Sequence, residues 1–247
     1  MSEMTDTPLL FLAGTLCDRR VFAPLCRAMG MSAPTVRLEG ADSAPEMAAR
    51  LLAAAPRRLA LCGFSLGAIV ALEMVAQAPD RIERLALLGC TARPMPESTA
   101  VARREAVKVA AREGCASYIA TAWDASVPAW RADDAGLRQE LEAMAADTPL
   151  ESFRQQVEIA ARRNDSRPRL SQIAVPTLVL CGEEDRVCPP ELSREIADAV
   201  PGAQLSIVER AGHYVTLDQP DVTAEAIRDW LARPAPKFAN RHREVFS

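Results

Sequence analysis

The chain has 247 residues, of which 49% are hydrophobic and 25% charged, and its formal net charge is −4. This length and composition predict a globular protein with a sizeable buried core and argue against general disorder. The weak negative charge argues against nucleic acid as a partner, because no large positive field surrounds the molecule. No apolar run reaches the roughly 20 residues of a membrane-spanning helix, so we expect a cytoplasmic protein without a membrane partner.

Six short apolar segments predict β-strands along the chain. Most are bounded by glycine or proline and are apolar on both faces, as expected for central strands of a parallel sheet. The predicted strands are residues 9–13, 35–38, 59–62, 85–88, 177–181 and 205–208, and the helix-period segments between them are residues 21–29, 46–55, 66–77, 190–200 and 222–232. This alternation predicts an α/β protein with a doubly wound, mostly parallel sheet of about six strands.

One interval, residues 93–167, breaks the alternation. It contains no strand pattern but four helix-like runs, near residues 98–112, 115–121, 136–145 and 149–163. An insertion between two strands is where a lid over an active site is expected. We therefore expect one core domain made of residues 1–92 and 168–235, a helical lid over residues 93–167, and a poorly packed tail over residues 236–247.

The seven cysteines and two histidines limit the candidates for a nucleophile, a general base and a metal ligand. The cysteines are odd in number and form no C-x-x-C pair, which indicates free thiols in a reducing compartment. Cys17 or Cys188 could act as a nucleophile, although a buried or incidental thiol is the favoured interpretation. Two histidines nearly exclude a histidine-rich metal site, so we expect no metal. The candidate imidazole bases are His213 and His242, and we expect His242, which lies between two arginines, to be solvated.

The pentapeptide Gly63-Phe64-Ser65-Leu66-Gly67 directly follows one predicted strand and directly precedes a predicted helix. A serine on such a strand-to-helix turn presents its hydroxyl at the end of a sheet, where a substrate carbonyl can approach. The two glycines suit a turn that brings two backbones close together. The context therefore favours a nucleophilic serine over an ordinary turn serine.

A serine hydroxyl needs a base, and the base needs an acid that orients it. Acidic residues follow the predicted strand 177–181 in the segment Gly182-Glu183-Glu184-Asp185, and His213 follows the strand 205–208. The loops that carry these groups are expected at the carboxyl ends of parallel strands, so their side chains can meet at one edge of the sheet. The order serine, acid, histidine is the order of α/β-hydrolase chemistry.

With these motifs the chain resembles the α/β-hydrolase superfamily from residue 8 to residue 232, apart from the lid. The matching pieces are residues 12–15, the serine pentapeptide, residues 78–82 before a strand, the loop 182–189, and Gly212-His213 with Pro220 beyond. The resemblance implies an α/β-hydrolase fold of six parallel strands that lacks the N-terminal hairpin.

The resemblance also implies a role for each site residue. Ser65 would be the nucleophile and His213 the general base and then acid. Asp185 would be the orienting carboxylate, with Glu184 as the alternative. The oxyanion hole would come from the backbone N–H groups of Leu66 and Thr15, although Ala13 stands where the family often has histidine.

The implied function is hydrolysis of a small-molecule ester through an acyl-enzyme on Ser65. Alternatives with the same triad are a carbon–carbon bond hydrolase or enol-lactonase, and an acyltransferase; a non-enzymatic ligand receptor is a further alternative on this scaffold. No P-loop and no G-x-G-x-x-G after a strand is present, so we expect no cofactor. The expected partner is a small-molecule acyl substrate, and a homodimer is left open.

Substrate contacts would come from the lid. Tyr118, Trp123 and Trp130 are candidate substrate-binding residues, although packing of the lid onto the core is the favoured interpretation. Four basic residues recur there at helical spacing, namely Arg103, Arg104, Lys108 and Arg112. They could meet an anionic substrate or an acidic carrier protein, but a solvated helix face is favoured.

Overall fold

The computed structural model describes residues 7–235 of the chain; the expected tail and His242 lie outside the described residues. Six strands form one parallel sheet in the order β2-β1-β3-β4-β5-β6. Their bounds are β1 Leu9–Leu12, β2 Thr35–Val36, β3 Leu59–Phe64, β4 Ile82–Leu88, β5 Thr177–Gly182 and β6 Gln204–Val208. All six predicted strands are thereby confirmed.

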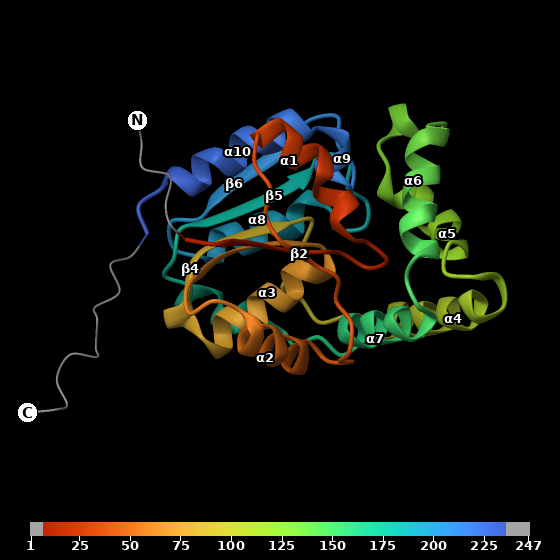
Figure 1. The fold of residues 1–247 in the computed structure, drawn as a ribbon, viewed down its shortest axis with the longest axis horizontal. Coiled ribbons are helices and arrows are strands. Elements are labelled where there is room, and N and C mark those ends of the chain that lie inside the picture. Colours follow the sequence, from red (N-terminus) through yellow and green to blue (C-terminus); the bar gives the residue numbers. More distant parts are fainter. Residues whose placement is uncertain (1–6, 236–247) are drawn as a thin grey trace, which may run out of the picture.

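Helices cover both faces of the sheet (Figure 1). One face carries α1 (Ala23–Met29) and α10 (Pro220–Ala232), which pack against each other. The other face carries α2 (Ala44–Ala54), α3 (Leu66–Gln77) and α8 (Pro190–Ala199). The doubly wound α/β architecture predicted from the strand and helix alternation is confirmed.

Strand residues alternate between two hydrophobic clusters, one on each face of the sheet. On β4, Ala86 and Leu88 belong to the cluster with α1 and α10, whereas Leu85 and Leu87 belong to the cluster with α2 and α3. Successive side chains of a strand point to opposite faces, so a strand covered on both faces must be apolar throughout. This explains why β4 is buried along its whole length.

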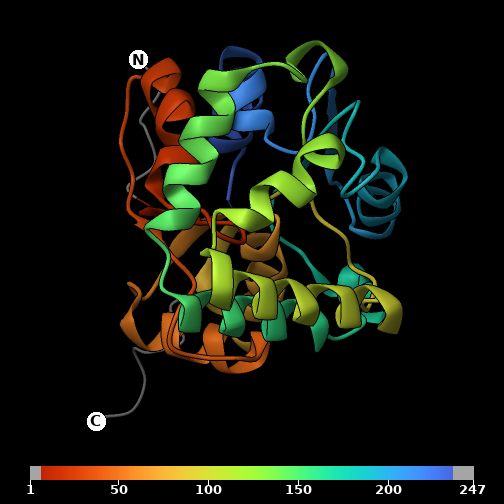
Figure 2. The ribbon, with the colours of Figure 1, turned by 90° about the vertical axis from the view of Figure 1, so that its right-hand side faces the viewer.

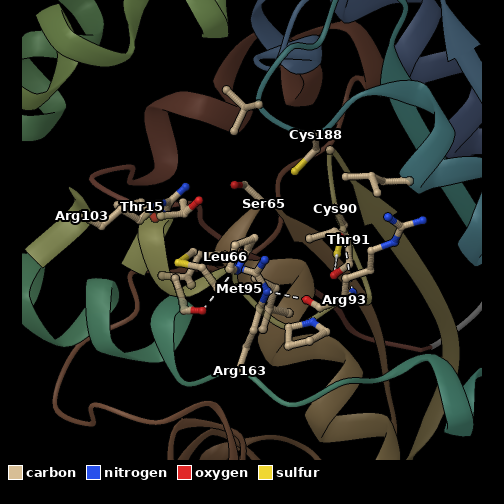
Figure 3. Close-up of a pocket in the computed structure, with 18 residues that line it drawn as sticks. Thr15, Ser65, Leu66, Cys90, Thr91, Arg93, Met95, Arg103, Arg163 and Cys188 are labelled. Carbon is tan, nitrogen blue, oxygen red and sulfur yellow. Dashed lines mark hydrogen bonds between the residues drawn. The ribbon is translucent and has the colours of Figure 1, made fainter. Parts of the chain in front are cut away.

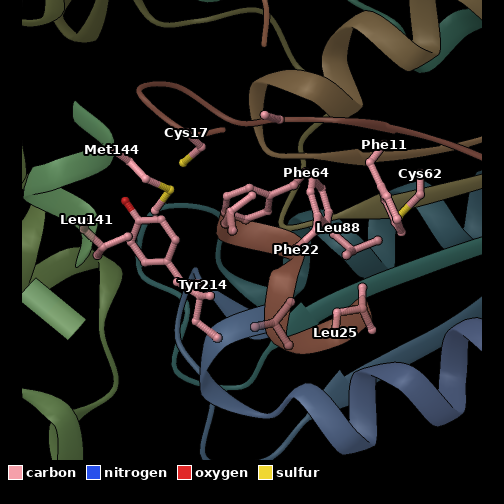
Figure 4. Packing of buried hydrophobic residues seen from close by; sticks show 14 of the residues in the cluster. Phe11, Cys17, Phe22, Leu25, Cys62, Phe64, Leu88, Leu141, Met144 and Tyr214 are labelled. Carbon is pink, nitrogen blue, oxygen red and sulfur yellow. The ribbon is translucent and has the colours of Figure 1, made fainter. Parts of the chain in front are cut away.

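Four helices lie between β4 and β5 and are called here the helical insertion. They are α4 (Glu97–Glu113), α5 (Ser117–Ser126), α6 (Ala135–Ala146) and α7 (Leu150–Ala161). Figure 1 shows them on the right, beyond the carboxyl ends of the strands, and Figure 2 shows them from that side, across the front of the molecule. They share one hydrophobic cluster with the sheet, where Leu141 and Met144 of α6 lie beside Tyr214 and Cys17 (Figure 4).

Most element boundaries differ from the prediction by a few residues, and two helices differ in a way that has a physical reason. The segment expected as one helix over residues 21–29 is a 3₁₀ turn, η1 (Arg19–Phe22), followed by α1, whose first turn contains Pro24. The helix expected over residues 115–121 extends as α5 to Ser126, because Trp123 and Ser126 are buried and continue its inner face. The helix ends before Pro128, because the proline ring disfavours the helical conformation for the preceding residue, Val127. None of the helices in residues 7–235 is both long enough and apolar enough to span a bilayer.

Candidate active site

Ser65 lies on a strained turn between β3 and α3. Its backbone has φ +52° and ψ −111°, a conformation that a residue with a side chain seldom adopts. The neighbouring glycines make the turn sterically feasible: a Cβ on Gly67 would lie 2.1 Å from the Leu12 carbonyl oxygen, and one on Gly63 would lie 2.5 Å from the Ala68 nitrogen. The elbow therefore requires glycine at both positions and lifts the Ser65 hydroxyl off the strand end.

The sheet topology brings the other site loops to the same edge. The chain passes from β1 outward to β2 and then returns to β3 on the other side of β1. The loops after β1 and β3 therefore diverge at a topological switch point, where open α/β sheets bind ligands. Thr15 follows β1 and Ser65 follows β3 at this point.

His213 joins Ser65 and Asp185 by hydrogen bonds. Its Nε2 lies 2.9 Å from Ser65 Oγ, and its Nδ1 lies 2.8 Å from Asp185 Oδ2. The other carboxylate oxygen, Oδ1, accepts the backbone N–H groups of Val187 at 2.9 Å and Cys188 at 2.8 Å. An Asp185 carboxylate fixed in this way accepts the Nδ1 proton of His213, which leaves Nε2 free to accept the hydroxyl proton of Ser65.

Glu184, the alternative acid, lies elsewhere. Its Oε2 accepts the backbone N–H of Ala129 at 2.9 Å, which ties the loop after β5 to the helical insertion. Asp185 is buried, and it alone of the acidic residues in this loop contacts His213.

Leu66 and Thr15, the two expected oxyanion-hole residues, line the same cavity as Ser65. Leu66 is the first residue of α3, where an N–H has no partner inside the helix. Within residues 7–235, neither the Leu66 N–H nor the Thr15 N–H has a hydrogen-bond acceptor. Both groups are therefore free to donate to an oxygen that approaches Ser65.

A buried glutamine of the helical insertion holds the loop that carries Thr15. Leu16 has φ +55°, and its N–H donates to Gln156 Oε1 at 2.9 Å. Gln156 Nε2 donates to the Leu38 carbonyl oxygen at 3.0 Å, and the side chain is fully buried on α7. Gln156 thus satisfies both of its polar ends while it fixes a strained backbone next to Thr15.

Ser65 lines two cavities. The larger has a volume of about 300 Å³ and is shown in Figure 3; the smaller has about 40 Å³. Tyr118 and His213 line only the smaller one. Trp123 and Trp130, the other two candidate substrate contacts, line neither cavity.

The two tryptophans have packing roles instead. Trp123 is buried in the helical insertion, with its Nε1 donating to the Ala132 carbonyl oxygen at 2.8 Å. Trp130 is 48% exposed and donates to the Arg210 carbonyl oxygen at 3.0 Å. Trp130 therefore links the insertion to the loop before His213.

The four basic residues of α4 separate into two groups. Arg104 pairs with Glu158 of α7, Lys108 pairs with Glu105, and Arg112 is exposed, as expected for a solvated helix face. Arg103 instead lines both cavities beside Ser65.

The two candidate cysteine nucleophiles are buried thiols. Burial, aided by the charge of Asp18, raises the pKa of the Cys17 thiol to about 12. Burial also holds the pKa of the Cys188 thiol well above its usual value, and the Asp185 charge adds to that effect. Neither thiol forms the reactive thiolate at neutral pH, which favours Ser65 as the nucleophile. In residues 7–235 no cluster of His, Cys, Asp and Glu could hold a metal ion.

Two residues at the site were not anticipated from the sequence, Gln156 and Arg163. Gln156 is a polar residue on the buried face of an amphipathic helix, and that position was the available signal. Arg163 follows α7 and lines the larger cavity, but no spacing in the sequence connects it to Ser65 or Arg103.

Comparisons with known proteins identify the family of the chain. A family model described as "Alpha/beta hydrolase family" matches residues 5–226. A putative carbamate hydrolase from Klebsiella pneumoniae is 28% identical over 204 residues, which cover 79% of this chain and 74% of that protein. A pimeloyl-[acyl-carrier protein] methyl ester esterase from Neisseria meningitidis is 29% identical over 177 residues, which cover 69% of this chain and 68% of that protein.

Solved structures share the fold over nearly the whole chain. A thermophilic esterase from Thermogutta terrifontis superposes with a TM-score of 0.83 at 24% identity, covering 92% of this chain and 90% of that one. An enol-lactonase from Burkholderia xenovorans superposes with a TM-score of 0.80 at 24% identity, covering 94% of each chain.

Proposed function

The chain belongs to the α/β-hydrolase family, and from this premise we propose that it is a serine hydrolase that cleaves a small-molecule ester through an acyl-enzyme on Ser65. The observation that carries the proposal is the hydrogen-bonded series Ser65, His213 and Asp185, with contacts of 2.9 and 2.8 Å, at a strained elbow that opens into a cavity. Relatives named as an ester hydrolase and a carbamate hydrolase support the same class of reaction.

Acylation begins when Ser65 Oγ attacks the ester carbonyl carbon. His213 Nε2 accepts the hydroxyl proton, and Asp185 stabilises the imidazolium that forms. The carbonyl oxygen becomes an oxyanion, to which the N–H groups of Leu66 and Thr15 donate; one such donor is typically worth about 3 kcal/mol in the transition state. The carbon–oxygen ester bond then breaks, and His213 gives its proton to the departing alcohol.

Deacylation repeats these steps with water. His213 accepts a proton from a water molecule, whose oxygen attacks the acyl carbon. The bond to Ser65 Oγ then breaks, and the serine recovers its proton from His213. The products are a carboxylic acid and an alcohol, and the enzyme returns to its starting state.

Replacement of Ser65 by alanine tests this proposal. We expect Ser65→Ala to lose p-nitrophenyl ester turnover by about 10⁴-fold or more, since the triad acts as a unit, and to lose labelling by a fluorophosphonate probe. Ser171→Ala changes an exposed serine outside both cavities and is the matched control. Turnover and labelling that persist in Ser65→Ala would refute the nucleophile assignment.

A substrate panel separates ester hydrolysis from the alternatives that share the triad. Esters, lactones, thioesters and vinylogous diketones are compared by kcat/KM, each beside Ser65→Ala. Preference for the diketone or lactone would replace the ester assignment with a carbon–carbon bond hydrolase or an enol-lactonase. An added alcohol or thiol that outcompetes water for the acyl group would indicate an acyltransferase.

A further inference from the structure

The larger cavity beside Ser65 carries a concentrated positive charge. Arg93, Arg103 and Arg163 line it, and no aspartate or glutamate does. The chain as a whole carries a net charge of −4, so the cavity is opposite in sign to the molecule. Figure 3 shows the three arginines around the space below Ser65.

Of the three guanidinium groups, that of Arg93 is already neutralised. Its Nε and Nη2 donate to the Glu195 carboxylate at 2.9 and 3.0 Å, in the two-bond geometry that suits this pair. Arg93 therefore contributes little net charge to the cavity.

Arg103 and Arg163 have no such carboxylate. Arg163 donates from Nε to the Arg93 carbonyl oxygen at 2.7 Å and from Nη1 to the Ala160 carbonyl oxygen at 3.3 Å, and its Nη2 has no acceptor within residues 7–235. Arg103 makes no hydrogen bond or ion pair with any described residue. Burial, and then the positive charge of Arg103, hold the pKa of Arg163 below its usual value.

Two half-buried cations near each other are unfavourable unless an anion offsets them. Two other arginines of the insertion have a carboxylate partner: Arg104 pairs with Glu158, and Arg154 pairs with Glu151. Arg103 and Arg163 differ from these two in lacking a carboxylate partner among residues 7–235, and they differ from the exposed Arg112 in being half-buried in the cavity beside Ser65. A bound ligand is the natural source of the missing negative charge.

The positions of the two cavities indicate where the alcohol and acyl portions of an ester would bind. His213, which protonates the departing alcohol, lines the smaller cavity of about 40 Å³ and not the larger one. The alcohol portion would then occupy the small cavity, which has room for about one small group. The acyl portion would occupy the larger cavity, where the rest of the lining, including Ile69, Met95 and Leu192, is mostly apolar.

We propose that the substrate is a small-alcohol ester whose acyl chain ends in a carboxylate, and that Arg103 and Arg163 bind this carboxylate in the larger cavity. This inference rests on the ester hydrolysis proposed above. An aliphatic stem would contact the apolar lining, and the carboxylate would accept hydrogen bonds from two guanidinium groups, one on α4 and one in the loop that follows α7.

The test compares esters that differ only at the far end of the acyl chain. Monomethyl esters of dicarboxylic acids from succinate to suberate are paired with the methyl esters of the matching monoamides, which are similar in shape but uncharged. We expect wild type to prefer the carboxylate by about 10- to 100-fold in kcat/KM for the chain length that fits, since charge-assisted hydrogen bonds are the strong ones. Arg103→Gln and Arg163→Gln should each lower that preference about tenfold.

Arg112→Gln is the matched control, because Arg112 is an exposed arginine on the same helix. It should leave the preference unchanged. Equal turnover of acid and amide at every chain length, or a preference that survives in Arg103→Gln, would overturn the proposal. Arg163 also bonds backbone carbonyls, and its replacement could disturb folding. Arg103→Gln breaks no hydrogen bond or ion pair among the described residues, so it carries the test alone.

A binding measurement separates this inference from the proposed reaction. Calorimetric titration of Ser65→Ala with the preferred dicarboxylate and its diamide needs no turnover. We expect the dicarboxylate to bind at least tenfold more tightly, and Arg103→Gln to remove the difference. Ester turnover that depends on Ser65 without this difference would refute the inference and leave the hydrolase intact. Binding that depends on Arg103 in a protein without Ser65-dependent turnover would refute the hydrolase instead.

Discussion

Gln156 shows how one buried side chain can hold the loop beside a proposed oxyanion donor. The Leu16 N–H that it accepts belongs to a residue with φ +55°, next to Thr15, one of the two oxyanion donors proposed here. A backbone in this region returns to an ordinary conformation unless its surroundings hold it. The Gln156 amide supplies that constraint, and it is itself fixed by the Leu38 carbonyl oxygen.

Replacement of Gln156 by methionine should therefore affect the chemical step. Methionine keeps the length of the side chain but cannot accept from the Leu16 N–H, so the loop relaxes and the Thr15 donor moves. We expect kcat to fall by about 10- to 100-fold with little change in KM, because an oxyanion donor acts mainly in the transition state. The buried N–H left without a partner should also cost about 1–3 kcal/mol in the free energy of unfolding.

Kinetics with a neutral ester, together with urea unfolding, check this expectation. Gln139→Met, an exposed position on α6, is the matched control and should change neither quantity. A Gln156→Met enzyme that is less stable but has wild-type kcat would show that the glutamine only supports the fold.

Among single residues, the sequence predicted those that directly follow a strand in a recognisable motif. It missed those that come together only through tertiary packing. The prediction of Ser65, His213 and Asp185 relied on strands that end beside them, and the structure brings the three into contact. Arg103 lies on α4 and Arg163 in the loop that follows α7, and tertiary packing brings both to one cavity, so no local pattern connects them.

At the scale of elements, boundaries were predicted best where backbone chemistry fixes them. The predicted helix over residues 66–77 coincides with α3, which begins at the serine elbow and ends before Pro79. The short helix α9 (Val215–Asp218) was missed, because its four residues carry no helical period. Contacts outside the helix hold its last residue: the Asp218 carboxylate accepts the Gly212 N–H at 2.9 Å and pairs with Arg131 of the insertion.

The contact between α4 and α7 should depend on pH through Glu158. Hydrogen bonding to Arg104 lowers the pKa of Glu158 below its usual 4.5. The folded state thus favours the charged carboxylate, and this stabilisation is present above the unfolded pKa and lost as the pH falls through the folded one. Arg104 is 39% exposed, so solvent limits the contribution to less than about 1 kcal/mol.

Urea midpoints at a series of pH values measure this contribution. The wild-type midpoint should fall between about pH 5 and pH 3, and Glu158→Gln should show a smaller fall and a lower midpoint at neutral pH. Glu140→Gln, an exposed carboxylate with no ion pair among the described residues, should follow the wild type. Identical pH profiles for Glu158→Gln and wild type would mean that the pair contributes nothing to stability.

For the whole molecule, the sequence predicted a core and a separate lid, and the division into two units stays a prediction. The structure shows that the insertion and the sheet contribute to one hydrophobic cluster, in which Trp123 and Phe153 of the insertion join Phe11 and Phe64 of the sheet. Such sharing leaves no sequence signal, because apolar residues that face another part of the chain look like those that face their own helix.

A shared cluster predicts that the insertion and the sheet unfold together. The variant Trp123→Phe/Trp130→Phe leaves Trp230 as the only tryptophan, fully buried in α10 with its Nε1 donating to the Pro176 carbonyl oxygen at 2.9 Å. Its fluorescence reports on the core, whereas far-ultraviolet circular dichroism of the same variant also reports on α4–α7. We expect the two urea transitions to coincide, as two-state unfolding requires. A circular dichroism transition that begins at lower urea than the Trp230 transition would show instead that the insertion opens first, as an independent lid.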